Sequence, residues 1–183
     1  MQVRASGLAC LVASLLAMSA DVDALLVPGP WSDNTKLPPL ARARMLLANL
    51  TQEEKLGFLH GGCSGYVFNS CGVPRLGIPN VRANDGPQGF RGPSGTSTAW
   101  PSGLAIGATF DLTAARLWGE AQGREFALKG ANVQLGPGLC LARTPNGGRA
   151  FEYMSGEDPY LGYTIVQPAV QGIQSQGVVA NGE

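Results

Sequence analysis

The chain has 183 residues, with 13 lysines and arginines against 13 aspartates and glutamates, so its formal net charge is +0. Proteins that bind nucleic acid or anionic membranes normally present a basic patch, and this charge balance argues against both kinds of partner. A composition that is 44% hydrophobic and only 14% charged excludes a disordered tail, and the length predicts one domain.

The first residues have the pattern of an export signal. Arg4 gives a short positive start, and the uncharged apolar run GLACLVASLLAMSA follows from Gly7 to Ala20. This run is short for a membrane span, and the polar sequence SADVDA ends it. A membrane anchor or a buried helix is the alternative. We expect residues 1–24 to be a signal peptide, residues 25–183 to form the folded part, and the mature protein to be secreted, without membrane contact.

Cysteines and histidine limit the kinds of site. Cys63 and Cys71 frame the sequence CSGYVFNSC, and export implies an oxidising compartment, so we predict a local disulfide, with two buried thiols as the alternative. Cys140 is then an unpaired thiol. The single histidine, His60, follows an apolar helix end, and we expect it to pack rather than to catalyse. Without a CxxC pair or a second histidine we expect no zinc or iron site, no Ser-His-Asp site and no cofactor.

The first periodic segment predicts a helix. Residues 40–50 carry apolar side chains at helical spacing after a Pro-Pro dipeptide, and LTQEEKLGFL follows them. Thr51 and Glu54 have the spacing of a capping box, in which each side chain bonds the backbone amide of the other residue. Asn49 also begins a glycosylation sequon whose third residue is Thr51, and its use is left open because Thr51 is expected to cap the helix.

After a glycine-rich loop at 61–77, short apolar strands alternate with amphipathic helices. The strands are expected at 79–83, 102–110, 131–138 and 178–181. The helices are expected at 111–130, capped by Asp111 and ended by Gly130, and at 160–177, with Pro168 kinking the helix. This alternation predicts parallel β/α units, and each strand ends in a polar turn rich in glycine or proline.

The predicted fold class is α/β, with the layout of a (β/α)8 TIM-like barrel whose site is built from the loops after its strands. An open doubly wound sheet is the alternative, and the lack of a GxGxxG or GxxxxGK[ST] loop after the first strand disfavours it. Because a barrel needs about 250 residues, we expect a partial barrel here, roughly its first half.

Two clusters of polar and aromatic residues follow predicted strands, RANDGPQGFR at 82–91 and RTPNGGRAFEYMSGEDPYLG at 143–162. A sugar is held by charged groups that bond two hydroxyls at once and by aromatic faces against its C–H surfaces. Asp85 and Arg149 are the candidates for the first role, and Glu152 is expected to orient Arg149. The candidates for the apolar walls are Phe90, Trp100, Phe151 and Tyr153.

The carboxylates in these clusters also have ordinary structural interpretations. Asp-Gly-Pro is a common turn, in which Asp85 would bond its own backbone, and the sequence leaves this alternative open. Glu157 and Asp158 precede a proline and fit the acidic start of a helix, so we assign both of them to structure rather than to a site.

Five segments in order resemble a known family: LTQEEKLGFL, IPNVRANDGPQGFR, TAWPSGLAIGATFD, GREFALKGANVQLGPGLCLARTPNGGRAFEYMSGEDPYLG and VQGIQSQGVVAN. Together they are similar to the N-terminal part of glycoside hydrolase family 3, nearest to secreted β-glucosidases, from about residue 37 to 181. The resemblance implies a barrel domain, followed in full-length members by an α/β sandwich. It also implies retaining hydrolysis of terminal β-linked glucose from a β-glucoside or oligosaccharide, by an aspartate nucleophile and a glutamate acid/base.

Matched residue by residue, Asp85 corresponds to the family's aspartate that grips glycone hydroxyls, and Arg149 to its glycone-binding arginine. After GVVAN the family continues towards a Lys-His pair, where this chain has Gly182 and Glu183. The nucleophile and acid/base lie further along in the family, so we assign no catalytic residue. The resemblance implies β-glucosidase activity for the full-length protein and an inactive chain by itself. A non-catalytic secreted sugar-binding or degenerate fragment is the alternative.

Overall fold

The computed structural model describes residues 29–33, 36–63, 65–92 and 95–183. The predicted signal peptide, residues 1–24, lies outside them. The described residues form two units, of which the smaller holds those up to Leu59 with Gly72–Asn80, and the larger holds His60–Cys71 with Val81–Glu183. In this described part of the chain no helix is long and apolar enough to cross a membrane.

The smaller unit is helical. Its elements are α2 (Pro30–Asp33), α3 (Pro39–Asn49), α4 (Gln52–Gly57) and the 3-10 turn η1 (Pro74–Leu76). The predicted capping box is confirmed, since Glu54 N donates to Thr51 Oγ1 at 3.2 Å and Thr51 N donates to Glu54 Oε2 at 2.8 Å. The hydrogen bond from Arg75 to the Glu54 carboxylate, together with that from Thr51, lowers the pKa of Glu54 to about 2. Glu54 therefore ties η1 to the start of α4.

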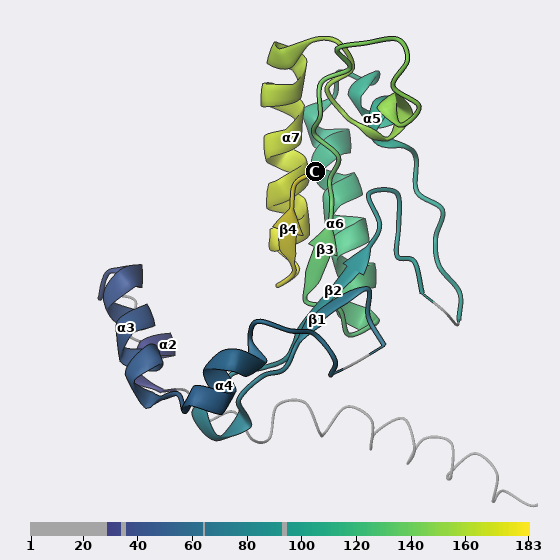
Figure 1. Ribbon diagram of the computed structural model, residues 1–183. Coiled ribbons are helices and arrows are strands. Elements are labelled where there is room, and N and C mark those ends of the chain that lie inside the picture. Colours follow the sequence, from purple (N-terminus) through teal and green to yellow (C-terminus); the bar gives the residue numbers. More distant parts are fainter. Residues whose placement is uncertain (1–28, 34–35, 64, 93–94) are drawn as a thin grey trace, which may run out of the picture. The chain divides into compact units, whose positions relative to one another are not determined.

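The larger unit is built on a four-stranded sheet in the order β1-β2-β3-β4 (Figure 1). The strands are β1 (Phe68–Ser70), β2 (Val81–Asp85), β3 (Val133–Leu135) and β4 (Val179–Asn181). Strands β2, β3 and β4 run parallel, whereas β1 pairs antiparallel with β2. The parallel strands expected near 79–83, 131–138 and 178–181 are therefore confirmed, with different bounds.

Helices connect the parallel strands. Between β2 and β3 lie α5 (Gly103–Gly107) and α6 (Leu112–Leu128), and between β3 and β4 lie η2 (Ala150–Glu152) and α7 (Pro159–Gln174). The predicted start and stop of α6 are confirmed, since Asp111 Oδ1 accepts from Thr113 N at 2.8 Å and Gly130 follows the helix with a φ of 79°. Helices α6 and α7 pack along each other against the sheet (Figure 1). Strand–helix–strand units of this kind are those of a (β/α)8 barrel.

Two elements differ from the expectation. Residues 102–110, expected to be a strand, contain helix α5, because the Ser102 hydroxyl accepts from Ala105 N at 3.2 Å and caps a helix. The glycine that begins α5 lets it lie against η2, since a Cβ at Gly103 would be 2.3 Å from a backbone oxygen of η2. The loop expected at 61–77 contains strand β1 and turn η1. A short apolar run by itself does not distinguish a strand from a short buried helix.

The described cysteines and the histidine lie in loops of the larger unit. Cys63 and Cys71 form a disulfide with Cα atoms 5.4 Å apart, which closes the loop around β1. Cys140 is a free and exposed cysteine. His60 is exposed, so the expectation that it packs is wrong. The apolar helix end before His60 does not bury it, because the chain turns into an exposed glycine-rich loop at that point.

Helices α6 and α7 approach each other through glycines. A Cβ at Gly119 would lie 2.2 Å from Ala169 O, and a Cβ at Gly172 would lie 2.4 Å from Arg116 O. The buried core beside this contact consists of Ile106, Ala115, Trp118, Met154, Ile165 and Ala169. The absence of a side chain at the two glycines therefore sets the distance between the helices.

We expect Gly172→Ala to lower the free energy of unfolding by about 1–3 kcal/mol, because the added methyl group meets the backbone of α6 and has no flexible side chain to displace. Chemical unfolding followed by circular dichroism measures this. Gly148→Ala is the control, since nothing lies within 4 Å of a Cβ built there, and we expect a change within about 0.5 kcal/mol. Equal losses in the two variants would contradict the close-approach argument.

Candidate functional site

The candidate residues lie at the carboxyl end of the parallel strands. Asp85 ends β2 and is in register with Leu135 at the end of β3, which in turn is in register with Asn181 at the end of β4. Arg149 lies in the loop after β3, immediately before η2. Because barrels build their sites from the loops after the strands, the fold brings both candidates to the edge where a site is expected.

The carboxylate of Asp85 has a side chain as its partner. Arg91 Nη1 donates to Asp85 Oδ2 at 2.7 Å, and the side chains of Arg91 and Asp85 are 71% and 29% exposed. Among the described residues the hydrogen bond to this carboxylate comes from Arg91 and not from the backbone of its own turn. An exposed ion pair contributes only about 0–1 kcal/mol, so a ligand hydroxyl can replace the guanidinium at little cost.

The turn after Asp85 requires the glycine that follows it. Gly86 has a φ of 154°, and a Cβ there would lie 2.0 Å from Gly89 O. The buried Asn84 donates through Nδ2 to the carbonyl oxygen of Arg91 and so closes the same turn. The sequence Asn-Asp-Gly-Pro therefore reverses the chain tightly and leaves the carboxylate at the end of the strand.

Arg149 is held by acidic and aromatic neighbours. Its Nε donates to Glu152 Oε1, its Nη2 lies 3.6 Å from Glu183 Oε2, and its Cζ lies 5.9 Å from the centroid of the Tyr153 ring. The hydrogen bond to Glu152, followed by the nearby charges, raises the pKa of Arg149 above its ordinary value, so the side chain stays charged. It remains 66% exposed, which leaves guanidinium nitrogens available to a ligand.

Glu152 is the buried member of this group. Its side chain is 6% exposed against 66% for that of Arg149. The turn η2 that carries it packs closely on α5, where Gly103 leaves room for the Glu152 carbonyl. A carboxylate fixed by such packing is suited to orient an exposed guanidinium, and this role for Glu152 stays a prediction.

A cavity of about 320 Å³ opens beside Arg149. It is lined by Leu141, Ala142, Arg143, Thr144, Gly147, Gly148, Arg149, Ala150 and Tyr153. Two guanidinium groups, a hydroxyl and a tyrosine ring are groups that bind polar, hydroxyl-bearing ligands. Asp85 does not line this cavity. The structure therefore brings Asp85 and Arg149 to one edge of the sheet but not into one cavity.

The four aromatic candidates divide into two pairs. Tyr153 lines the cavity beside Arg149, and Phe151 is exposed in the same loop. Phe90 packs edge-to-face on a buried ring of α6 with centroids 5.1 Å apart, and Trp100 packs against the core beside α6. The structure thus uses Phe90 and Trp100 to anchor the segment after β2, and it leaves Tyr153 and Phe151 near the guanidinium.

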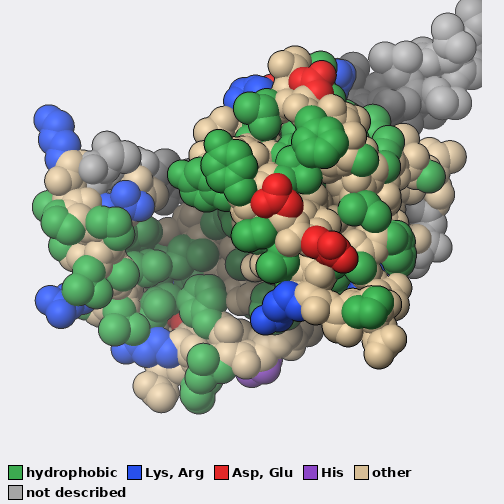
Figure 2. All heavy atoms as spheres, turned by 90° about the horizontal axis from the view of Figure 1, so that it is seen from above, with side chains coloured by type: hydrophobic (Ala, Val, Ile, Leu, Met, Phe, Trp, Pro, Cys, Tyr) green, Lys and Arg blue, Asp and Glu red, His purple; other side chains and the backbone are tan. Residues whose placement is uncertain are grey.

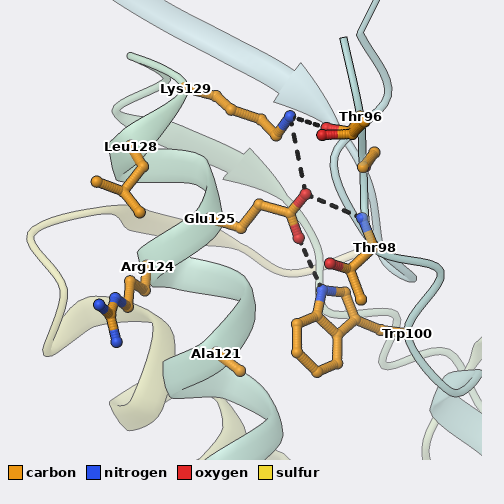
Figure 3. Close-up of a pocket in the computed structure, with 9 residues that line it drawn as sticks. Thr96, Thr98, Trp100, Ala121, Arg124, Glu125, Leu128 and Lys129 are labelled. Carbon is orange, nitrogen blue, oxygen red and sulfur yellow. Dashed lines mark hydrogen bonds and ion pairs between the residues drawn. The ribbon is translucent and has the colours of Figure 1, made fainter.

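Sequence reasoning missed Glu125, which fastens the segment after β2 to α6 (Figure 3). Its carboxylate accepts from Thr98 N and from Trp100 Nε1, both at 3.0 Å, and Lys129 Nζ lies 3.9 Å away. Burial alone would raise the pKa of Glu125, but the hydrogen bonds outweigh it and hold the pKa below its ordinary value. No local pattern pairs a helical glutamate with a loop so far from it in the sequence.

Two further acidic residues of the second cluster, Glu157 and Asp158, lie at the start of α7. Asp158 Oδ1 accepts from Tyr160 N at 2.8 Å and caps α7, so its assignment to structure is confirmed. Glu157 is exposed beside it. Within the residues that the structure describes, no group of three or more His, Cys, Asp or Glu side chains is arranged to hold a metal ion.

The larger unit also exposes apolar surface. Seen from above, hydrophobic side chains cover much of its face, with a few acidic side chains among them (Figure 2). A groove of about 510 Å³ is lined by Leu139, Leu141, Ser155, Pro159, Gly162, Tyr163, Val166 and Gln167. Because this lining holds no charged group, the groove is a poorer candidate for a sugar than the cavity beside Arg149.

The sequence of most of the larger unit matches a known family. Residues 67–183 match the family model described as the glycosyl hydrolase family 3 N terminal domain, which is more than half of the chain. The chain belongs to glycoside hydrolase family 3. The family predicted from the five sequence segments is therefore confirmed.

Curated relatives in family 3 include β-glucosidases. The chain is 38% identical over 161 residues to Beta-glucosidase A of Aspergillus kawachii, and 39% identical over 164 residues to a β-glucosidase of Bacteroides ovatus. These alignments cover 84% and 82% of this chain but 18% and 21% of the two relatives. The chain therefore spans about a fifth of the length of these relatives.

Solved structures of family 3 enzymes share the fold. A β-glucosidase from Streptomyces venezuelae in complex with D-glucose matches with a TM-score of 0.73 and 38% identity, over 78% of this chain and 18% of that one. The β-D-glucoside glucohydrolase of Trichoderma reesei matches with a TM-score of 0.71 and 32% identity, over 86% and 22%. The prediction of a partial TIM-like barrel of class α/β is confirmed by these matches.

We expect Glu125→Gln to reduce the loss of stability in acid. Because the folded-state pKa of Glu125 lies below its ordinary value of 4.5, the ionised carboxylate stabilises the fold above pH 4.5. This contribution is lost as the pH falls through the folded-state pKa. Thermal unfolding midpoints measured across the acid range check this.

Glu120→Gln is the control for this measurement, since Glu120 lies on the same helix and pairs with Arg116 at the surface. We expect the control to keep the acid dependence of the unchanged chain. An acid dependence that is the same in Glu125→Gln as in the unchanged chain would contradict the assigned role of the carboxylate.

Proposed function

We propose that this chain is the N-terminal part of a secreted, retaining β-glucosidase, which removes terminal non-reducing β-D-glucose from β-glucosides or oligosaccharides. The observation that carries the proposal is the 38% identity to Beta-glucosidase A over 84% of this chain. The position of Asp85 and Arg149 at the carboxyl edge of the sheet supports it.

The role proposed for each residue in binding the sugar follows from the chemistry of its side chain. Asp85 accepts hydrogen bonds from glycone hydroxyls in place of Arg91, which is exposed and easily displaced. Arg149, oriented by Glu152, donates to glycone hydroxyls through the nitrogens that face solvent. The Tyr153 ring, which lines the cavity beside Arg149, offers an apolar face to the C–H surface of the sugar.

Hydrolysis with retention needs two carboxyl groups about 5–5.5 Å apart, one as nucleophile and one as acid/base. We assign neither role to a residue of this chain, and we propose that the rest of the protein supplies both. By itself the chain then contributes sugar-binding groups and no hydrolysis. Secretion is supported by the export pattern of residues 1–24 and by the disulfide between Cys63 and Cys71.

The decisive experiment is to read the coding sequence beyond the codon for Glu183, express the resulting protein and assay it with p-nitrophenyl β-D-glucoside. We expect hydrolysis by the longer protein and none by the chain of 183 residues. If the longer protein hydrolyses p-nitrophenyl β-D-xyloside but not the β-glucoside, the proposed substrate changes from a β-glucoside to a β-xyloside. A longer protein that hydrolyses neither would contradict the proposed activity.

Asp85→Asn tests the binding role in the longer protein. We expect kcat/KM to fall about 10- to 100-fold, because a hydrogen bond to a charged group contributes about 1.5–3 kcal/mol. Glu157→Gln is the matched control, since this carboxylate is exposed and lies outside the proposed site. If both variants are active and have the same kcat/KM, Asp85 does not bind the substrate, and this part of the proposal is wrong.

A further inference from the structure

A buried pair of amide side chains contacts the turn that follows Asp85. Gln134 in the middle of β3 and Gln122 on α6 are both 0% exposed. Gln134 Nε2 donates to Gln122 Oε1 at 2.8 Å and to the carbonyl oxygen of Gly86 at 3.1 Å. One amide group therefore links a strand, a helix and the residue immediately after Asp85.

The sheet register shows how this contact reaches Asp85. Asn84 is the Cα partner of Gln134, and Asp85 is the partner of Leu135. Because successive side chains of a strand point to opposite faces, Gln134 and Asn84 share the face covered by α6, and Asp85 projects from the other. Gln134 thus affects Asp85 only through the backbone, by its hydrogen bond to the carbonyl oxygen of Gly86, the first residue after β2.

The bond from Gln134 anchors the turn to the sheet. The Gly86 carbonyl also accepts from Gly89 N, but at 3.4 Å, and the Asp85 carbonyl accepts from Arg91 N at 3.1 Å. Both of these donors belong to the turn and the segment after it. Gln134 is the donor that comes from a different strand, and its bond is the shorter of the two on the Gly86 oxygen. It therefore fixes the turn relative to its neighbours.

Packing by itself does not account for two glutamines at these positions. Gln122 Nε2 and Gln134 Oε1 have no hydrogen-bond partner among the described residues. A buried polar atom without a partner costs about 1–3 kcal/mol, whereas a pair of apolar side chains of similar size leaves no such atom. The amide of Gln134 donates a hydrogen bond to Gly86, which the side chain of leucine or methionine could not do because it has no donor.

We propose that Gln134 is a positioning residue that sets the direction of Asp85 by fixing the Gly86 carbonyl. The consequence for sugar binding rests on the proposed function, which assigns Asp85 to the glycone. The effect on the turn does not depend on that function, because it concerns hydrogen bonds that exist without a sugar.

Gln134→Leu and Gln122→Leu in the whole chain form a matched pair. Each removes one buried amide of equal size, but only the first removes the donor to Gly86. We expect backbone hydrogen exchange at Gly89 and Arg91 to rise about five- to tenfold in Gln134→Leu and to stay within about twofold in Gln122→Leu, the effect of one neutral hydrogen bond. Equal acceleration in both variants, or in neither, would overturn the proposal.

Amides of α7 report whether the fold itself survives. If Gln134→Leu loses protection there as well, the same comparison is made with Gln134→Met, which is unbranched and fills irregular space more easily. Selective exchange of the turn in Gln134→Met supports the positioning role. Loss of α7 protection in both Gln134 variants but not in Gln122→Leu would show that Gln134 stabilises the whole unit, and would overturn the local role.

Calorimetric titration with D-glucose separates this inference from the proposed function. Binding by the unchanged chain that weakens at least about fivefold in Gln134→Leu, but less than about twofold in Gln122→Leu, supports both. If the unchanged chain does not bind glucose, the sugar-binding role proposed for Asp85 in this chain fails, while the exchange comparison still decides the role of Gln134.

Discussion

The common register of β2, β3 and β4 is the constraint on which the candidate site depends. Parallel pairing places Asp85, Leu135 and Asn181 at one level, so that the loops after all three strands leave the sheet at one edge. The carboxylate of Asp85 and the loop of Arg149 are far apart in the sequence, and this pairing brings them to that edge. A change of register by one residue would turn the side chain of Asp85 to the opposite face.

That register is maintained by packing on the helical face of the sheet. Helices α6 and α7 come close enough to cover it because Gly119 and Gly172 carry no side chain. The same face holds the amides of Gln122 and Gln134, which join α6 to β3 and to the turn after β2. The layer that stabilises the sheet therefore also contains the contact proposed to direct Asp85.

Charged groups near the strand ends are restrained by partners and remain open to solvent. Arg149 is held through the buried Glu152 and stays mostly exposed, and the partner of Asp85 is itself an exposed arginine. Glu125 differs, since both oxygens of its carboxylate accept hydrogen bonds, one from Thr98 N and the other from the indole of Trp100. Charged groups that stay open to solvent, such as Asp85 and Arg149, are available to a ligand. The carboxylate of Glu125 instead anchors a loop.

Much of the fold and part of the site followed from the sequence because their signals are local. The capping box of Thr51, the start of α6 at Asp111 and the apolar runs of three strands depend on residues within a few positions of one another. Residues 102–110 contain a helix in place of the expected strand, and this choice depends also on a non-local contact, the close approach of Gly103 to the backbone of η2.

The sequence by itself therefore determined the three parallel strands, the two long helices that follow β2 and β3, the family, and the identity of Asp85 and Arg149 as candidates. Only the tertiary structure decided that Arg91 pairs with Asp85, that Glu125 anchors a loop, and that Gln134 bonds the Gly86 carbonyl. The contacts of Glu125 and Gln134 join segments that are far apart in the sequence. Their geometry depends on how strands and helices pack, and no local pattern of side chains encodes it.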